Sequence, residues 1–232
     1  MAPIWFAPRL RWRRWRRSSC GYVRAARDRG LPLSSAVAIR PFHAQDEGAV
    51  RDLFVLVNRL LAPPSARDAF EAYIERSVAE EIGRVADYYR EHDGGFWVAV
   101  RDGVLVGMFG LERAAPDAME LRRMYVDPSA RRAGIARAML RRAETECRSF
   151  GARRLELSTS ELQPAALELY RRAGYRQVRE EVAEAASNKT VGGGIRRYYF
   201  EKEVNAGNGW DTHAASGLQI FGRTRSIPGG EG

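Results

Sequence analysis

The sequence has few of the residues that build disulfide frameworks and metal sites. Its 232 residues include two cysteines, Cys20 and Cys147, and three histidines, and none of these has the spacing of metal ligands. A secreted fold held together by several disulfides is therefore excluded, and we expect no bound metal. So little cysteine is typical of a reducing compartment, and a cytoplasmic location is the expectation.

Long hydrophobic runs are also missing. No apolar stretch approaches the roughly 20 residues that a helix needs to span a bilayer, so we expect no transmembrane segment. The N-terminal stretch MAPIWFAPRLRWRRWRRSSC lacks the apolar core of a secretory signal and is instead rich in arginine. This composition leaves three interpretations open: an organelle transit segment, an anchor for a membrane surface or nucleic acid, and a disordered extension without a role.

Positive charge is concentrated at the N-terminus. The formal net charge is +9, but residues 1–30 hold nine arginines against Asp28, while residues 205–232 are neutral. The body between them is therefore almost neutral, and we expect no specific nucleic-acid partner. Composition divides the chain into an Arg-rich, disordered extension (1–34), one domain (35–204) and a Gly-rich, disordered tail (205–232).

The order of hydrophobic patterns in the body predicts a mixed α/β fold. A short strand near residues 37–40 precedes a helix that starts at Asp46, and a second helical region covers about residues 65–91. We interpret the many acids and arginines of this second region as a solvated face. Two β-rich runs joined by Asp102-Gly103 predict a hairpin, because both turn residues need positive φ. Four further strands and two helices follow, so we expect helices packed against a mixed sheet (α+β) rather than a doubly wound dinucleotide fold.

The strand MELRRMYV changes its buried face in the middle. Met119 and Leu121 occupy odd-numbered positions, but the next apolar residues, Met124 and Val126, occupy even-numbered ones. In a regular strand, odd and even positions point to opposite faces. A one-residue bulge at the two arginines between them would produce this change, and bulges often lie beside ligands. A strand buried on both faces is the alternative.

The stretch RRAGIA starts the next helix without an obvious side-chain cap. The N–H groups of an uncapped helix N-terminus and its partial positive charge attract anions such as phosphate. Gly134 allows close approach of a ligand to the backbone, and Ala136 adds no bulk. The stretch therefore favours a pyrophosphate site, although it has neither a Walker lysine nor G-x-G-x-x-G. An exposed basic turn without a ligand is the alternative.

Taken in order, these features resemble the Gcn5-related N-acetyltransferase (GNAT) superfamily. Its acetyl-CoA signature is Q/R-x-x-G-x-G/A, and Arg131, Gly134 and Ala136 occupy the three fixed positions. The resemblance covers roughly residues 39–204 and includes the hairpin, the changed strand and the helix ALELYRRAGY. It implies a mixed, mostly antiparallel sheet of six to seven strands flanked by about four helices. The stretch LSTSELQPAALELYRRAGY looks like the camello-type branch, some members of which acetylate aspartate or cysteine conjugates.

The resemblance implies acetyl-CoA as co-substrate. In this family the backbone of the signature loop holds the pyrophosphate, and the bulged strand contacts the pantetheine arm through its backbone. The positions that match these roles are Arg131, Arg132, Ala133, Gly134, Ile135 and Ala136 in the loop, and Met124, Tyr125 and Val126 in the strand. Gln163 stands where many relatives have an asparagine that contacts the cofactor arm, and Cys147 falls on the core side of its helix.

The chemistry that the resemblance implies, direct attack of an amine on a thioester, needs a base and an acid. An ammonium with a pKa around 10 must lose a proton before it attacks, and a thiolate leaves more readily when an acid is near. Tyr170 is similar to the tyrosine that often serves as the acid, and a packing role is its alternative. Glu120 lies where several relatives place the base, and a solvated or salt-bridged glutamate is its alternative.

Acceptor choice in this family depends on the first two helices and on the loop before the last strand. Here the loop SNKTVGGGIRR combines three glycines with Lys189, Arg196 and Arg197, which would pair with a carboxylate. The expected acceptor is therefore the amine of a small molecule that also bears an acid, such as an amino acid or its conjugate. A protein or peptide N-acetyltransferase and a non-catalytic acyl-CoA-binding module are the alternatives. A homodimer is compatible with the sequence.

Overall fold

The computed structural model describes residues 36–204. The segments 1–35 and 205–232 lie outside the described residues, and so do the predictions of an Arg-rich extension and a disordered tail.

In the described part of the chain, seven strands form one sheet in the order β1-β2-β3-β4-β5-β7-β6. Every neighbouring pair is antiparallel except β4 and β5, which run parallel because a helical crossover joins them. The predicted mixed, mostly antiparallel sheet is confirmed. The strands are β1 (Ala38–Pro41), β2 (Gly95–Arg101), β3 (Val104–Ala115), β4 (Ala118–Val126), β5 (Arg154–Ser160), β6 (Arg176–Ala183) and β7 (Ile195–Glu203).

Five α-helices cover the described sheet, where the sequence predicted about four. The extra helix arises because the helical region expected over about residues 65–91 is interrupted by a π-helical turn, η4, and by Gly83. The helices are α2 (Glu47–Leu61), α3 (Arg67–Ser77), α4 (Val85–Glu91), α5 (Ile135–Ser149) and α6 (Pro164–Arg172), and the short turns are η2 (Ala44–Asp46), η3 (Pro64–Ala66), η4 (Val78–Ile82) and η5 (Pro128–Ala130).

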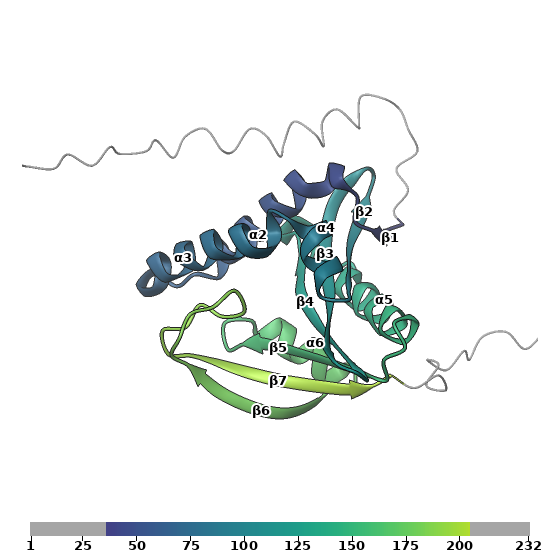
Figure 1. Cartoon of the computed structure of the whole chain (residues 1–232). Helices are drawn as coiled ribbons and strands as arrows, with labels where there is room; N and C mark the ends of the chain where they lie inside the picture. The colour runs from purple at the N-terminus through teal and green to yellow at the C-terminus, as the bar shows by residue number, and fades with distance from the viewer. Residues whose placement is uncertain (1–35, 205–232) are drawn as a thin grey trace, which may run out of the picture.

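The two faces of the sheet carry separate hydrophobic clusters. Helices α2, α3 and α4 pack on one face and α5 and α6 on the other, as Figure 1 shows. In α5, Ile135, Met139, Ala143 and Cys147 recur every four residues, so they share one side of the helix and are all buried. Burial raises the pKa of the Cys147 thiol to about 11, which agrees with the predicted core role.

The local turn predictions are confirmed. Asp102 and Gly103 join β2 to β3 with φ angles of 53° and 76°. Asp46 precedes α2 directly, and its carboxylate accepts a hydrogen bond from the backbone N–H of His43 at 2.8 Å and pairs with Arg40 at 2.7 Å. The hairpin turn is therefore built from the residue types that its backbone geometry requires, whereas the side chain of Asp46 makes no capping hydrogen bond to α2 itself.

Strand β4 contains the predicted bulge. Across the β3–β4 ladder, Met108 pairs with Tyr125 and Gly110 pairs with Arg122, so one residue of β3 faces two residues of β4. Arg123 is one of those two and has a φ of 53°, in the left-handed region that few non-glycine residues adopt. The extra residue turns both arginines toward the face that carries α2, α3 and α4.

The same bulge explains the apolar pattern of the strand. Met119 and Leu121 are buried in the cluster on the α5 side. Beyond the bulge, Met124 and Val126 pack against that same cluster. The predicted change of parity is therefore confirmed, and it keeps four apolar side chains on one face.

Strands β4 and β5 separate halfway along. Residues 118–121 of β4 pair with residues 154–157 of β5. From Arg122 onward, no strand of the described chain pairs with this side of β4. Figure 1 shows the sheet opening here, with β5, β7 and β6 turning away from β4. Backbone N–H and C=O groups on this edge are therefore available to a ligand.

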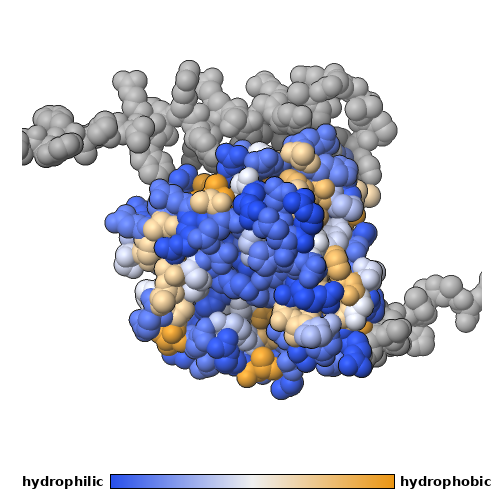
Figure 2. All heavy atoms as spheres, in the orientation of Figure 1, coloured by the Kyte–Doolittle hydropathy of each residue, from blue (hydrophilic) through white to orange (hydrophobic). Residues whose placement is uncertain are grey.

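Figure 2 shows a face that is mostly hydrophilic, with apolar residues in small patches separated by polar ones. Within residues 36–204, no helix has both the length and the apolar composition to cross a bilayer. In the same part of the chain, no group of three or more His, Cys, Asp or Glu side chains could hold a metal ion.

Candidate active site

A large cavity lies where β4 and β5 separate. Its volume is about 580 Å³. It runs from the start of α5, along the free edge of β4, to the start of α6. Among the residues that line it are Met124, Tyr125, Val126, Arg131, Arg132, Gly134, Ile135, Ala136, Gln163 and Tyr170. The structure thus brings together ten of the predicted site residues, while Ala133 belongs to the same loop but does not line the cavity.

The start of α5 is an uncapped helix N-terminus. Its N-cap residue is Gly134, with a φ of 75°, and no side chain within residues 36–204 caps the helix. The nearby carboxylate of Asp127 instead accepts from the backbone N–H of Ser129 at 2.8 Å and caps η5. The first N–H groups of α5 therefore point into the large cavity without a side-chain partner, next to two exposed arginines.

A smaller cavity, which we call the inner chamber, adjoins the large one. It has a volume of about 90 Å³. Its lining includes Tyr73, Glu120, Arg122, Arg123, Ser158, Thr159, Lys189 and Arg197. The two cavities share Met124, Tyr125, Gln163, Ala166 and Tyr170, so the free edge of β4 and the helix α6 form the boundary between them.

Tyr170 lies at this boundary on a well-delimited helix. Pro164 occupies the first turn of α6, and Gly174 follows its end with a φ of 82°, as predicted. The ring packs between Tyr175 and Phe200, with centroids 5.9 and 6.0 Å away. Only 5% of Tyr170 is exposed, and its hydroxyl makes no hydrogen bond to another described residue. Burial raises the pKa of this hydroxyl, so it keeps its proton at neutral pH.

Glu120 points away from the core on the α5 side, as its parity predicted, and lines the inner chamber. Its carboxylate accepts a hydrogen bond from Nζ of Lys189 at 2.6 Å. Glu120 is therefore salt-bridged in this structure, which was the alternative to its predicted role as the base. Its side chain remains 21% exposed, so solvent and small molecules can still reach it.

Beneath the inner chamber, two buried arginines converge on one buried carboxylate. Arg122 and Arg123 donate to Oε2 of Glu81 at 2.7 and 2.6 Å, and the hydroxyl of Tyr89 donates to Oε1 at 2.7 Å. Glu81 is 0% exposed, so the interpretation of its helical region as a solvated face is wrong at this position. Sequence reasoning missed Glu81, although two adjacent arginines in a buried strand imply a buried acid near them.

The π-helical turn η4 supplies Glu81 to this cluster. Such turns are rare and often occur at functional sites. Burial opposes ionisation of Glu81, but the charges and hydrogen bonds of Arg123 and Arg122 outweigh it and hold its pKa below the ordinary value. The carboxylate therefore stays ionised and fixes the position of both guanidinium groups under the β4 bulge.

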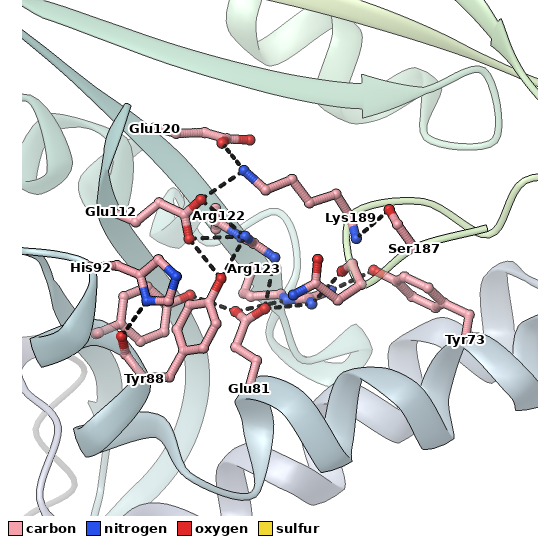
Figure 3. Close-up of polar contacts among 12 residues, drawn as sticks. Tyr73, Glu81, Tyr88, His92, Glu112, Glu120, Arg122, Arg123, Ser187 and Lys189 are labelled. Atoms are coloured by element: carbon pink, nitrogen blue, oxygen red, sulfur yellow. Dashed lines mark hydrogen bonds and ion pairs between the residues drawn. The ribbon is translucent and has the colours of Figure 1, made fainter. Parts of the chain in front are cut away.

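A second carboxylate, Glu112 on β3, completes the cluster. It accepts from Nη1 of Arg122 at 2.9 Å and from the hydroxyl of Tyr88 at 2.9 Å. Burial raises the pKa of Glu112, but the neighbouring charges of Arg122 and Lys189 lower it further than burial raises it. Figure 3 shows these groups in a continuous network from the π-helical turn to the loop between β6 and β7.

The loop of residues 184–194 is attached to this network. Arg123 donates to the backbone carbonyl of Asn188 at 2.6 Å. The ammonium of Lys189 donates to Glu112 at 2.7 Å and to Glu120 at 2.6 Å (Figure 3). The loop therefore reaches from the far side of the opened sheet to β3 and β4 and covers part of the inner chamber.

The three cations expected to bind a carboxylate differ in their positions. Lys189 lines the inner chamber but already pairs with two carboxylates. Arg196 lines neither cavity and pairs with Glu180 on β6 at 2.9 Å, so the structure does not bring it to the site. Arg197 lines the inner chamber, donates to the hydroxyl of Ser158 at 2.5 Å, and has no acidic partner among the described residues.

Comparisons with known proteins agree with this architecture. The model of the acetyltransferase (GNAT) family matches residues 63–175. The N-acetylaspartate synthetase of Danio rerio is 32% identical over 117 residues, which cover 50% of this chain and 42% of that protein. N-acetyltransferase 8 of Homo sapiens is 29% identical over 118 residues, which cover 48% and 52%. The chain thus spans about half the length or less of these relatives.

Solved structures show the same fold. A Salmonella typhimurium protein solved with its cofactor acetyl-CoA is similar to this chain with a TM-score of 0.58. The similarity covers 77% of this chain and 99% of that one, at 17% sequence identity.

Proposed function

We propose that this chain, whose residues 63–175 match the model of the acetyltransferase (GNAT) family, moves an acetyl group from acetyl-CoA to the amine of a small molecule that also bears a carboxylate. The observation that carries the proposal is the junction at Tyr170. There, a cavity that starts at an uncapped helix N-terminus meets a chamber that contains the carboxylate of Glu120. We also propose residues 35–204 as the catalytic domain.

The large cavity fits the shape and charge of acetyl-CoA. The N–H groups at the start of α5 would bind the pyrophosphate, since open space lies where a side chain on Gly134 would project. The free edge of β4 from Met124 to Val126 would accept the amide-bearing arm as an added strand, and Gln163 would contact it from α6. One N–H group of that edge would polarise the thioester carbonyl.

The proton transfers follow from the two ionisable groups at the junction. Acetyl-CoA supplies the thioester carbonyl that the amine attacks. Glu120 would take the proton from the acceptor's ammonium, whose pKa is around 10 in water. Tyr170 would donate its proton to the departing thiolate, and the raised pKa of its hydroxyl keeps that proton available.

The size and charges of the inner chamber support a small, acidic acceptor. The loop of residues 184–194 covers part of the chamber, whereas a peptide substrate would need an open groove. Arg197 offers a guanidinium without an acidic partner in the described chain, and a guanidinium binds a carboxylate with two parallel hydrogen bonds. A relative named N-acetylaspartate synthetase supports an amino acid as the acceptor. A protein or peptide acceptor is the second candidate, because the match covers only 42% of that relative's length.

Two measurements test the proposal. Isothermal titration with acetyl-CoA should show binding to the wild type and none to Gly134→Glu, since the new carboxylate would repel the pyrophosphate. Thiol release should then be followed with L-aspartate and other amino acids, and with peptides. Absence of acetyl-CoA binding to the wild type would overturn the proposal, and acetylation of peptides but not of amino acids would favour the second candidate.

A matched variant tests the role of Arg197. Hydrogen bonds to charged groups contribute about 1.5–3 kcal/mol, so Arg197→Gln should raise the KM of a carboxylate-bearing acceptor about 10- to 100-fold. The KM of an amine without a carboxylate should not change. Arg196→Gln is the control, since Arg196 lines neither cavity. An equal effect on both kinds of amine would show that Arg197 does not bind the carboxylate.

A further inference from the structure

Two glutamates lie directly opposite each other beside the inner chamber. Glu112 on β3 is the cross-strand partner of Glu120 on β4, and Glu156 on β5 is the partner of Glu120 on its other side. Like charges in such positions repel each other and destabilise a sheet. A cation between the first two carboxylates relieves this repulsion, and Figure 3 shows that this cation is the ammonium of Lys189.

The choice of lysine at this position is unusual for this chain. Of its 38 basic residues, only Lys189 and Lys202 are lysines. Lys202 is bound elsewhere, to Glu144 at 2.8 Å and to the carbonyl of Ala173 at 2.9 Å. An ammonium is a compact charge with three donors, unlike the planar guanidinium that the chain uses almost everywhere else. The carboxylate pair therefore holds a primary alkyl ammonium, which is the group that an amine acceptor presents.

The position of this ammonium is also the position that an acceptor needs. Lys189 lines the inner chamber together with Glu120, Arg197 and Tyr170, whose hydroxyl has no hydrogen-bond partner among the described residues. The side chain of Lys189 is 46% exposed, so it can leave the chamber toward solvent.

We propose that Glu112 and Glu120 form the binding site for the acceptor's ammonium group, and that Lys189 occupies this site until the acceptor replaces it. The inference rests on the proposed function and adds Glu112 as a positioning residue. Exchange of one ammonium for another keeps the charge of the cluster constant, so no buried carboxylate is left without a cation.

The backbone of the loop is built to allow this exchange. Gly192, Gly193 and Gly194 all have φ angles between 66° and 77°, a conformation that glycine adopts without strain. They separate Lys189 from the start of β7, so rotations within the triplet can withdraw the lysine while β6 and β7 stay paired. On the other side of Lys189, the hydrogen bond from Arg123 to the carbonyl of Asn188 lies where the segment that withdraws with the lysine would begin.

Because the chain has two lysines, the exchange can be observed directly. Protein labelled with ¹³C at lysine Cε should give one resonance for each lysine, and Lys189→Met assigns them. We expect methylammonium or L-aspartate to move the Lys189 signal toward that of a free lysine while Lys202 stays unchanged. Succinate, which has the carboxylates of aspartate but no amine, should move neither. No movement of the Lys189 signal with either ammonium probe would overturn the inference.

Kinetics give an independent readout. Lys189→Met removes the competing ammonium, so the KM of an acetylated amine should fall about fivefold while the KM of acetyl-CoA stays the same. Lys202→Met is the control and should change neither value. A rise in the KM of the amine would overturn the inference, because Lys189 would then help to bind the acceptor.

The two proposals fail in different ways. If the wild type acetylates an amine but Lys189 does not respond, the inference falls and the proposed function stands. If acetyl-CoA does not bind but the ammonium probes displace Lys189, the proposed function falls and the ammonium site stands. If neither is observed, both are overturned.

Discussion

Replacement of Glu81 by glutamine should destabilise the protein more than any single surface substitution. The fully buried carboxylate accepts from Arg122, Arg123 and Tyr89, and with Glu112 it balances the charges of the two arginines. Glutamine has nearly the same shape but no charge, so one guanidinium charge remains buried without compensation. Removal of one partner of a buried ion pair costs about 3–5 kcal/mol. For a domain of this size, that corresponds to a fall in Tm of about 6–20 °C.

The pH dependence provides a second signature of the same group. The pKa of Glu81 lies below its ordinary value in the folded protein, because the two arginine charges outweigh the effect of burial. A lowered folded pKa contributes stability that is present above the unfolded pKa of about 4.3 and is lost as the pH falls through the folded value. The difference in free energy of unfolding between the wild type and Glu81→Gln should therefore be constant near neutral pH and become smaller below about pH 4.3.

Urea unfolding of both proteins measures the effect, with Glu71→Gln as the matched control. Glu71 also accepts two hydrogen bonds from an arginine, Arg59, but both side chains are about half exposed. Exposed pairs contribute about 0–1 kcal/mol. If Glu81→Gln lowered the free energy of unfolding by less than about 1 kcal/mol, as the control does, the reasoning would be refuted. Water would then reach the cluster.

Three further predictions follow from single side chains. Tyr170→Phe should lower kcat about 100-fold or more in steady-state assays and leave the KM of acetyl-CoA unchanged, and an unchanged kcat would exclude it as the acid. Gly192→Ala should lower the free energy of unfolding by more than Gly193→Ala, since both have positive φ but only a Cβ on Gly192 would lie 2.8 Å from backbone atoms; equal losses in urea unfolding would contradict this. In a Cys20→Ser background, the thiol of Cys147 should react with a thiol reagent only after unfolding, because burial raises its pKa to about 11.

Features that depend on a few consecutive residues could be predicted from the sequence. The hairpin at Asp102-Gly103 needs two residues that tolerate positive φ, and its sequence contains them. The bulge in β4 follows from a change of parity between Leu121 and Met124, which only an odd number of extra residues can produce. The uncapped start of α5 at Gly134 is equally local, since no capping side chain precedes the helix.

Features that depend on which distant segments meet could not be predicted. Glu81 is 41 and 42 residues from the arginines that it binds, and periodicity alone assigned it to a solvated face. Lys189 lies 77 and 69 residues from its two carboxylate partners. A charged residue in a helical pattern is usually exposed. Glu81 is buried because the β4 bulge lies against the π-helical turn that carries it.

The bulge in β4 also limits how a site of this kind can arise by mutation. Adjacent residues of a regular strand point to opposite faces, so no substitution can place two consecutive arginines beside the same carboxylate. Only the insertion of one residue brings Arg122 and Arg123 to Glu81 together while the apolar residues after them stay in their own core. Deletion of Arg123 would restore regular alternation, so Met124 and Val126 would stay in their core and Arg122 would be the single β4 arginine beside Glu81. This cluster is therefore gained or lost by the insertion or deletion of a residue, and not by substitution.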